Sequence, residues 1–274
     1  MSGELPSQDR QAKQMSEYIF DEHQQDQELM RLRMIEELFD PTTIEHLEQT
    51  GICAGWRCLE LGAGAGSIMR WMGSIVGGNG SVVGVDKNAN HLRELSDPPL
   101  QIIEGDFLEA PLDDAFDLAH CRYVLIHNRS DDEILQKLCH ALRPGGFLVV
   151  EEPDFTSAKL LNRDVEESQQ RLNNAVCRMF EEMELDPAYG LSLPKKVAAE
   201  GLEIVEVDSR LHLVRGGSLM ARMMGASERA LADKYVATGE ASHADIERCI
   251  DNTNDDQFWT VHYCTVTVVA TKRP

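Results

Sequence analysis

Residues 58–67 read Cys-Leu-Glu-Leu-Gly-Ala-Gly-Ala-Gly-Ser, a short apolar run with an acid, followed by glycines at every second position. This pattern predicts a buried strand that meets a tight turn, which in turn opens a helix. Glycines in such a turn let the backbone approach a ligand where a Cβ atom would clash. We therefore expect a ligand to lie against this turn.

A second apolar run ends in an acid shortly after the glycines. Residues 81–85 read Ser-Val-Val-Gly-Val, and Asp86 follows them. An acid at the tip of the second strand of a βαβ unit is placed to bind ribose hydroxyls. The two features together predict a nucleoside-containing cofactor in the first half of the chain.

The glycine spacing argues against a dinucleotide. A dinucleotide-binding turn has the order G-x-G-x-x-G. Counted from Gly62, the third glycine would fall on Ser67, and counted from Gly64 it would fall on Met69. A nicotinamide-dependent oxidoreductase is therefore disfavoured.

The order acid-x-G-x-G-x-G, from Glu60 to Gly66, resembles the first motif of the class I S-adenosylmethionine-dependent methyltransferases. Further elements resemble that family in the same order over roughly residues 50–152, namely Asp86, Gly105-Asp106-Phe107, the run from Phe116 to Arg122, and the run from Leu142 to Glu152. The resemblance implies an α/β fold, a Rossmann-like, doubly wound sheet of seven mostly parallel strands. It also implies an antiparallel pair at the sheet edge and added helices that form a lid.

The same resemblance implies S-adenosylmethionine as the cofactor. The glycines would let its amino acid part lie against the backbone, while Glu60 would hold its ammonium group, directly or through water. Asp86 would bind the ribose, Asp106 would accept from the adenine amine, and Phe107 would lie against the ring. The cofactor-binding residues expected on this basis are Glu60, Gly62, Gly64, Gly66, Asp86, Lys87, Asp106, Phe107, Cys121 and Arg122.

A methyl group on a sulfonium is already activated, so the protein mainly supplies proximity and in-line orientation. A base is needed only where the acceptor must lose a proton. His127 is the first candidate for this role and His120 the second, although each is more often a hydrogen-bonded structural histidine. The candidates for substrate binding are two acids that would bind a cationic acceptor or else cap a loop, and two tyrosines that would gate the pocket: Glu152, Asp154, Tyr18 and Tyr189.

Composition limits the partners of this chain. Its 274 residues include 26 Lys and Arg against 47 Asp and Glu, a formal net charge of −21. A chain this acidic repels phosphates, so a nucleic acid substrate is disfavoured. The polar N-terminus and the absence of a membrane-length apolar stretch predict a soluble, cytoplasmic protein without a membrane partner. The seven cysteines form no C-x-x-C pair, so we expect neither a disulfide framework nor a metal site.

The pattern along the chain predicts a flexible arm at 1–14, an N-terminal helical lid segment at 15–50 that Pro41 interrupts, and a methyltransferase domain at 51–274. Helical insertions at about 160–185 and 217–250 would complete the lid. Strands are expected near 57–61, 81–85, 100–104, 115–121, 147–151, 202–214 and 261–271, and helices near 66–76, 88–95, 194–201 and after Ser130, which has capping-box spacing to Glu133.

The function expected from these features is methyl transfer from S-adenosylmethionine to a small-molecule acceptor. The helical additions suit a pocket that excludes water around such an acceptor. Oxygen, nitrogen and carbon acceptors all stay open. The alternatives are a methyltransferase acting on a protein or RNA, and a non-catalytic cofactor-binding module. The oligomeric state also stays open, and a homodimer is one alternative.

Overall fold

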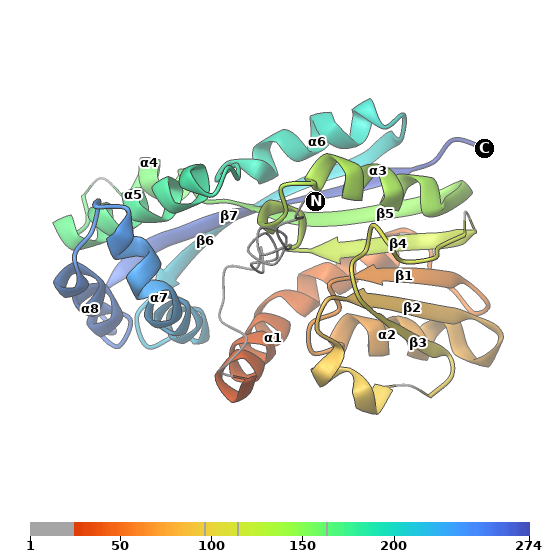
Figure 1. The fold of residues 1–274 in the computed structure, drawn as a ribbon, viewed down its shortest axis with the longest axis horizontal. Helices are drawn as coiled ribbons and strands as arrows, with labels where there is room; N and C mark the ends of the chain where they lie inside the picture. The colour runs from red at the N-terminus through yellow and green to blue at the C-terminus, as the bar shows by residue number, and fades with distance from the viewer. Residues whose placement is uncertain (1–24, 96, 114, 163) are drawn as a thin grey trace, which may run out of the picture.

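One sheet organises the chain, with its strands in the order β3-β2-β1-β4-β5-β7-β6 (Figure 1). The structure is a computed structural model that describes residues 25–95, 97–113, 115–162 and 164–274. The strands run over Arg57–Leu61 (β1), Ser81–Asp86 (β2), Leu100–Glu104 (β3), Phe116–Arg122 (β4), Leu142–Asp154 (β5), Glu203–Arg215 (β6) and Trp259–Thr271 (β7).

The pairing of these strands confirms the predicted fold class. Strands β1 to β5 pair in parallel, whereas β7 lies antiparallel to both β5 and β6. Parallel strands need crossover connections, and α-helices supply those from β1 to β2 and from β4 to β5. The antiparallel pair at the edge is the one that the family resemblance implies.

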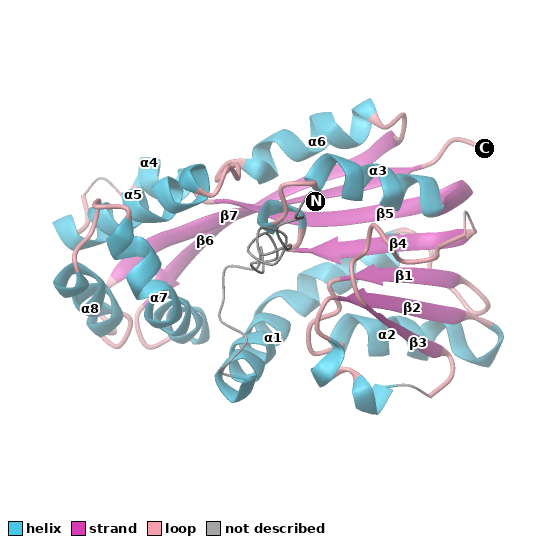
Figure 2. Ribbon diagram, viewed as in Figure 1, coloured by secondary structure: helices cyan, strands magenta, loops and turns pink. Residues whose placement is uncertain are grey.

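Helices cover both faces of the sheet (Figure 2). Side chains alternate between the faces along a strand. Leu59 packs with the face that carries α3 (Asp131–Ala141) and α6 (Tyr189–Ala199), whereas Cys58 packs with α2 (Ser67–Val76) on the opposite face. The apolar run that precedes the glycines is therefore buried on both sides, as expected of a strand in a doubly wound fold.

Four further helices gather at one end of the molecule, around the far ends of the long strands β6 and β7 (Figure 1). They are α4 (Thr156–Leu161), α5 (Glu167–Glu182), α7 (Leu219–Ala237) and α8 (His243–Asn252). The first predicted insertion, at about 160–185, contains mainly α5, and the second, at about 217–250, contains α7 and most of α8. The helix α1 (Gln25–Gln49) contacts α7 and completes this group.

The predicted break at Pro41 is wrong, because α1 continues through it to Gln49. The Arg122 guanidinium donates to Asp40 Oδ1 at 2.8 Å and to Thr43 Oγ1 at 2.7 Å. The helix is therefore held on both sides of the proline by one partly buried arginine, which offsets the backbone hydrogen bond that Pro41 cannot make.

Several other predicted element boundaries also change. The predicted helix at 88–95 is replaced by two 3-10 turns, at Ala89–His91 and Arg93–Leu95, and the helix predicted from 194 begins at Tyr189. Ser130 makes no capping hydrogen bond, whereas Ser242 forms a full capping box with Asp245 at the start of α8. Within the described residues, no helix has the length and apolar character needed to cross a membrane.

Candidate active site

A cavity of about 340 Å³ lies at the carboxyl ends of β1 to β4 and continues beneath α1, α5 and α7. Ligands of open α/β sheets bind at this edge, because the loops after parallel strands converge there. Nine predicted site residues line the cavity: Glu60, Gly62, Gly64, Asp86, Lys87, Asp106, Phe107, Arg122 and His127.

The glycine turn presents its backbone to the cavity. Gly62 has a φ of +70°, and a Cβ atom there would collide with the Val124 side chain. Gly64 has a φ of +57°, and the nearest neighbour of a Cβ atom there would be Leu32 of α1, at 3.6 Å. Gly66 caps the start of α2 outside the cavity lining. Both cavity glycines are needed for a left-handed backbone, and the turn between them lies open to a ligand.

Two carboxylates at the strand tips stand beside this turn. Asp86 Oδ2 accepts from the Gly64 N–H at 3.1 Å, which ties the tip of β2 to the glycine turn. Asp106 Oδ1 accepts from the Leu108 N–H at 2.8 Å, and its other oxygen lies 4.0 Å from Lys87 Nζ. The two carboxylates are thus held in place by backbone donors, with polar atoms at the cavity wall. Such a pair suits the hydroxyl and amine groups of a nucleoside.

A row of buried charges lies behind the turn. His120 Nδ1 is 2.8 Å from Glu60 Oε2, and His120 Nε2 is 3.4 Å from Glu151 Oε1. Burial alone would lower the pKa of His120, but the two carboxylates outweigh burial and raise that pKa to about 9. His120 is fully buried and does not line the cavity. A protonated His120 therefore fixes Glu60, which does reach the cavity wall.

His127 lies at the cavity wall in the turn after β4. Its ring stacks on Phe180 of α5, with centroids 6.0 Å apart. Burial, with a smaller contribution from Arg31, lowers the pKa of His127 to about 3. The imidazole is therefore neutral at neutral pH, and its low pKa makes it a weak base.

Aromatic side chains form the end of the cavity farther from the glycine turn. The Phe155 ring stacks on Phe180 at 5.1 Å and meets Tyr263 edge-on at 5.4 Å, and Tyr123 meets Tyr263 at 5.9 Å. His262 lies 4.4 Å from Tyr263 and also lines the cavity. None of these was among the predicted site residues. Tyr123 directly follows β4, whereas the others come from the end of β5, from α5 and from β7, far along the chain.

The helix α1 closes the cavity over the glycine turn. Glu36 Oε1 accepts from the backbone N–H of Ser67 at 3.0 Å, which places a carboxylate at the start of α2. Arg31 and Glu28 of the same helix pair at 2.7 Å and also line the cavity. The sequence predicted a lid helix here but not these side chains, because nothing local marks which face of α1 turns inward.

The structure places Glu152 outside the cavity lining, beneath the turn that follows β4. Its carboxylate accepts from the backbone N–H groups of Val124, Leu125 and Ile126, at 3.0, 2.7 and 3.2 Å. Burial nonetheless raises the pKa of Glu152 to about 8. The residue before these donors, Tyr123, has a φ of +58°, a conformation uncommon for a non-glycine residue. Glu152 thus holds a strained turn that faces the cavity.

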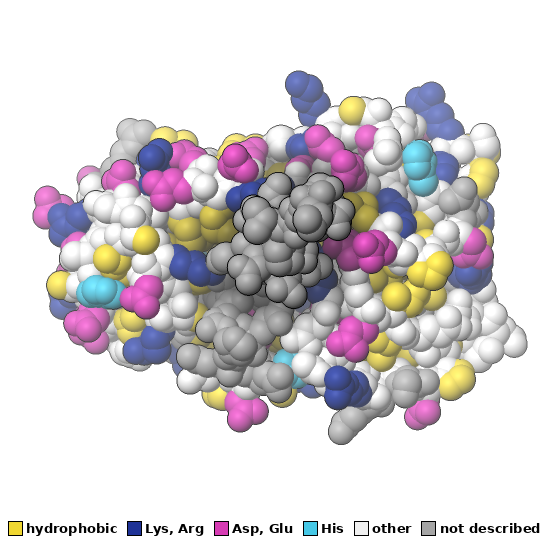
Figure 3. All heavy atoms as spheres, viewed as in Figure 1, with side chains coloured by type: hydrophobic (Ala, Val, Ile, Leu, Met, Phe, Trp, Pro, Cys, Tyr) yellow, Lys and Arg dark blue, Asp and Glu magenta, His cyan; other side chains and the backbone are white. Residues whose placement is uncertain are grey.

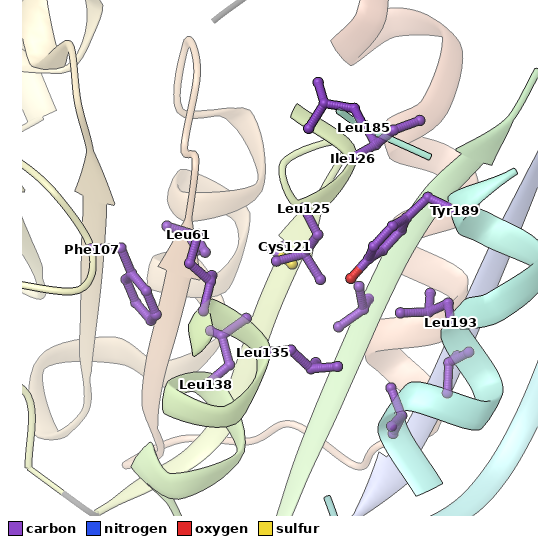
Figure 4. Packing of buried hydrophobic residues seen from close by; sticks show 14 of the residues in the cluster. Leu61, Phe107, Cys121, Leu125, Ile126, Leu135, Leu138, Leu185, Tyr189 and Leu193 are labelled. Atoms are coloured by element: carbon purple, nitrogen blue, oxygen red, sulfur yellow. The ribbon is translucent and has the colours of Figure 1, made fainter. Parts of the chain in front are cut away.

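The other predicted acceptor residues lie apart from the cavity. Asp154 Oδ1 accepts from the backbone N–H of Thr156, the first residue of α4, at 2.9 Å. Tyr189 is buried in the core, where its ring extends from α6 toward Cys121 of β4 (Figure 4). Cys121 is itself fully buried and does not line the cavity. Tyr18 lies outside the described residues.

Comparison with known proteins places this arrangement in a family. The family model of the methyltransferase domain matches residues 52–195, and the chain therefore belongs to that family. Fold and family together define a class I methyltransferase, whose cofactor is S-adenosylmethionine. Within the described residues, no group of three His, Cys, Asp or Glu side chains is arranged to hold a metal ion.

Two curated relatives illustrate the match. The ubiquinone/menaquinone biosynthesis C-methyltransferase UbiE of Pseudomonas paraeruginosa is 29% identical over 126 residues, which are 43% of this chain and 49% of that protein. An uncharacterized 37.1 kDa protein in transposon TN4556 of Streptomyces fradiae is 31% identical over 120 residues, which are 42% of this chain and 35% of that protein. The match spans about half or less of the length of these relatives.

Solved structures extend the likeness over most of the chain. A putative sarcosine dimethylglycine methyltransferase from Galdieria sulphuraria has a TM-score of 0.56 at 16% identity, covering 85% of this chain and 84% of that one. Phosphoethanolamine N-methyltransferase 2 from Haemonchus contortus has a TM-score of 0.57 at 16% identity, covering 94% and 60%. The [4+2]-cyclase SpnF has a TM-score of 0.54 at 20% identity, covering 85% and 80%. At these identities the likeness concerns the fold.

Proposed function

We propose that this chain transfers a methyl group from S-adenosylmethionine to a small-molecule acceptor. The observation that carries the proposal is a single cavity that runs from the glycine turn and its carboxylates to an aromatic end beneath α1, α5 and α7. Its volume of about 340 Å³ and its apolar far end are typical of small-molecule pockets. A macromolecular acceptor would need an open face beside the cofactor, whereas the helices α1, α5 and α7 cover this cavity.

The chain's own residues supply binding and orientation. When bound, S-adenosylmethionine supplies a methyl group activated by a positively charged sulfur. Asp86 would bind the ribose and Asp106 the adenine amine, while Glu60, fixed by His120, would hold the ammonium group. The helix α1 would exclude water from the reacting atoms, which favours the transfer. His120 is then a positioning residue, because it acts through Glu60.

His127 is the proposed base for an acceptor that must lose a proton. Its neutral ring lies at the wall where the cofactor end meets the aromatic end, against Phe180. An acceptor nucleophile would attack the methyl carbon as the carbon–sulfur bond breaks, and its proton would pass to the imidazole. An acceptor that is already neutral and nucleophilic would need no such transfer.

Proteins of similar fold have other roles. The solved complex of a putative methyltransferase with the activator Trm112 from Haloferax volcanii shows a similar fold with a protein partner, at a TM-score of 0.54. The [4+2]-cyclase SpnF has a similar fold and is named for a different reaction. A protein or RNA methyltransferase and a non-catalytic cofactor-binding module are the alternatives that an experiment must separate.

The first experiment is calorimetric titration of the full chain with S-adenosylhomocysteine, with NADH as the negative ligand. We expect binding by the homocysteine compound alone. Loss of the Asp86 carboxylate in Asp86→Ala should weaken it about 10- to 100-fold, as expected for hydrogen bonds to a charged group. The control is Glu104→Ala. Glu104 is the residue of β3 that pairs with Asp86, and its carboxylate is exposed. Equal affinities in all three proteins would contradict the proposed cofactor site.

A second experiment identifies the kind of acceptor. The chain is incubated with S-adenosylmethionine that carries a radioactive methyl group and with a fractionated cell extract. We expect label in the small-molecule fraction. Label in protein or RNA would instead support the macromolecular alternative, and no transfer by protein that binds the cofactor would support the non-catalytic one.

A further inference from the structure

A second, smaller chamber adjoins the aromatic end of the cavity. Its volume is about 40 Å³, and it lies where α5 and α7 face each other. The walls that it shares with the main cavity are Phe155, Val176, Ser227, Tyr235 and His262. The chamber is thus an extension of the acceptor end, away from the glycine turn.

A buried acid without a partner lines this chamber. Glu228 of α7 is 5% exposed, and its Oε2 has no hydrogen-bond partner among the described residues. Burial raises its pKa to about 8, which Arg229 only partly offsets. A buried polar group with no partner is costly to a fold, and a buried ionised carboxylate is more so. The cost points to a ligand that completes the site.

Three polar side chains that line the chamber make contacts with other groups. Gln169 Nε2 donates to Asn173 Oδ1 at 3.2 Å, and Asn173 Nδ2 points to the Ala158 carbonyl at 3.5 Å. Ser227 Oγ points to Met223 Sδ at 3.7 Å. These three side chains are therefore directed elsewhere, and Glu228 Oε2 is left without a hydrogen-bond partner among the described residues.

The shared walls favour a cation as the missing partner. Tyr235, Phe155 and His262 present aromatic rings between the two cavities. Aromatic faces attract ammonium groups, and a buried carboxylate is compensated by a charged partner rather than by a neutral one. The net charge of −21 also draws cations toward the molecule as a whole.

We propose that this chamber binds a protonated amino group of the acceptor, with the Glu228 carboxylate as its counter-ion. The inference rests on the proposed function and narrows its substrate to acceptors that carry a primary or secondary amine at the end away from the methyl donor. The amine pairs with Glu228 and lies against the shared aromatic walls, so it anchors the acceptor and sets how far its reacting end reaches toward the cofactor.

When the ammonium group of the acceptor pairs with Glu228, a proton would be released from the Glu228 carboxyl. Glu228 is mostly protonated at pH 7 in the free protein, and it ionises when an ammonium group is seated beside it. The titratable and charged groups around it are Arg229 and Tyr235 on α7, Cys249 on α8 and His262 on β7, while α5 contributes only the amides of Gln169 and Asn173. Burial keeps the Tyr235 and Cys249 pKa values high and lowers that of His262 to about 3, so Glu228 is the group that titrates.

The test uses the full chain saturated with S-adenosylhomocysteine. Calorimetry at pH 7 compares straight-chain and phenyl-substituted monoamines, each with the alcohol of the same skeleton, in two buffers of different ionisation enthalpy. We expect at least one amine to bind about tenfold or more tightly than its alcohol and to release close to one proton. Glu228→Gln should remove both the preference and the proton release. Asp233→Asn, which removes an exposed carboxylate from the same helix, should change neither.

Three outcomes separate the possibilities. Equal affinity within every amine–alcohol pair, or no binding by any probe to protein that binds S-adenosylhomocysteine, would overturn the inference. Failure of the unmodified chain to bind S-adenosylhomocysteine would instead overturn the proposed function. Thermal melts confirm that Glu228→Gln is folded, and Glu228→Met repeats the test with an apolar side chain of similar length. Both variants should bind S-adenosylhomocysteine as the unmodified chain does.

Discussion

At the scale of single residues, the most informative side chain is that of His120, which the sequence analysis predicted as a candidate base. His120 is buried between two carboxylates, so its proton stabilises the row of charges behind the glycine turn. Its usual pKa is 6.5, and the folded protein raises that value to about 9. A raised pKa makes a contribution to stability that is complete below pH 6.5 and is lost as the pH rises through 9.

His120→Gln should therefore lower the free energy of unfolding most at pH 6 and least above pH 9. The expected pH-dependent difference is at most about 3 kcal/mol, which corresponds to the whole pKa shift of His120. Urea unfolding of both proteins across this pH range measures it. His140→Gln, at an exposed position on α3, is the control. A constant difference at all pH values would mean that His120 is not protonated in the fold.

The residues at the glycine-turn end of the cavity were predictable, because each stands in a local pattern. Gly62, Gly64 and Asp86 follow apolar runs directly, and the structure places all three on the cavity wall. Phe180 and Tyr263 were not predictable in the same way. They reach the cavity only through the packing of α5 and β7, and in sequence they look like ordinary core residues.

At the scale of elements, the helix α1 covers the glycine turn, and a side-chain hydrogen bond joins the two. Its contact with the glycine turn depends on Glu36, which accepts from the Ser67 N–H at the start of α2. Glu36→Ala removes that cap, which typically contributes about 1 kcal/mol. We expect S-adenosylhomocysteine to dissociate about fivefold faster in stopped-flow experiments. Glu37→Ala, one residue along at an exposed position, should leave the rate unchanged, and an equal rate in both variants would show that α1 does not retain the ligand.

A second prediction at this scale concerns the turn after β4. Glu152 holds three successive backbone N–H groups and thereby the left-handed conformation of Tyr123. Glu152→Gln leaves one fewer oxygen acceptor and turns an amide donor toward those N–H groups. We expect a loss of about 1–3 kcal/mol in unfolding free energy, measured with urea. Glu133→Gln, exposed on α3, is the control, and similar stability in the two variants would contradict this role.

The course of α1 also shows where a reading of elements from sequence fails. Pro41 normally ends a helix, so a break was the reasonable prediction. The partly buried Arg122, far along the chain, donates hydrogen bonds to Asp40 and Thr43 on either side of the proline. A tertiary contact therefore overrides a local rule, and no pattern near residue 41 reveals it.

At the scale of the whole molecule, charge acts on the ligand before any contact forms. On the face shown in Figure 3, Lys and Arg side chains are interspersed with Asp and Glu, so the acidic side chains there do not gather in one patch. With a net charge of −21, the protein attracts a cation from solution. S-adenosylmethionine carries one net positive charge, whereas S-adenosylhomocysteine, which lacks the sulfonium, carries none.

The two ligands should therefore respond differently to salt. Between about 20 and 300 mM sodium chloride, screening shortens the reach of the protein's field severalfold. We expect the dissociation constant for S-adenosylmethionine to rise several-fold and that for S-adenosylhomocysteine to stay nearly constant, as measured by calorimetry in parallel titrations. The neutral ligand is the matched control, because it has the same ribose, adenine and amino acid groups. An equal salt response of the two would mean that local carboxylates such as Glu60 and Asp86, rather than the overall charge, govern recognition of the cationic cofactor.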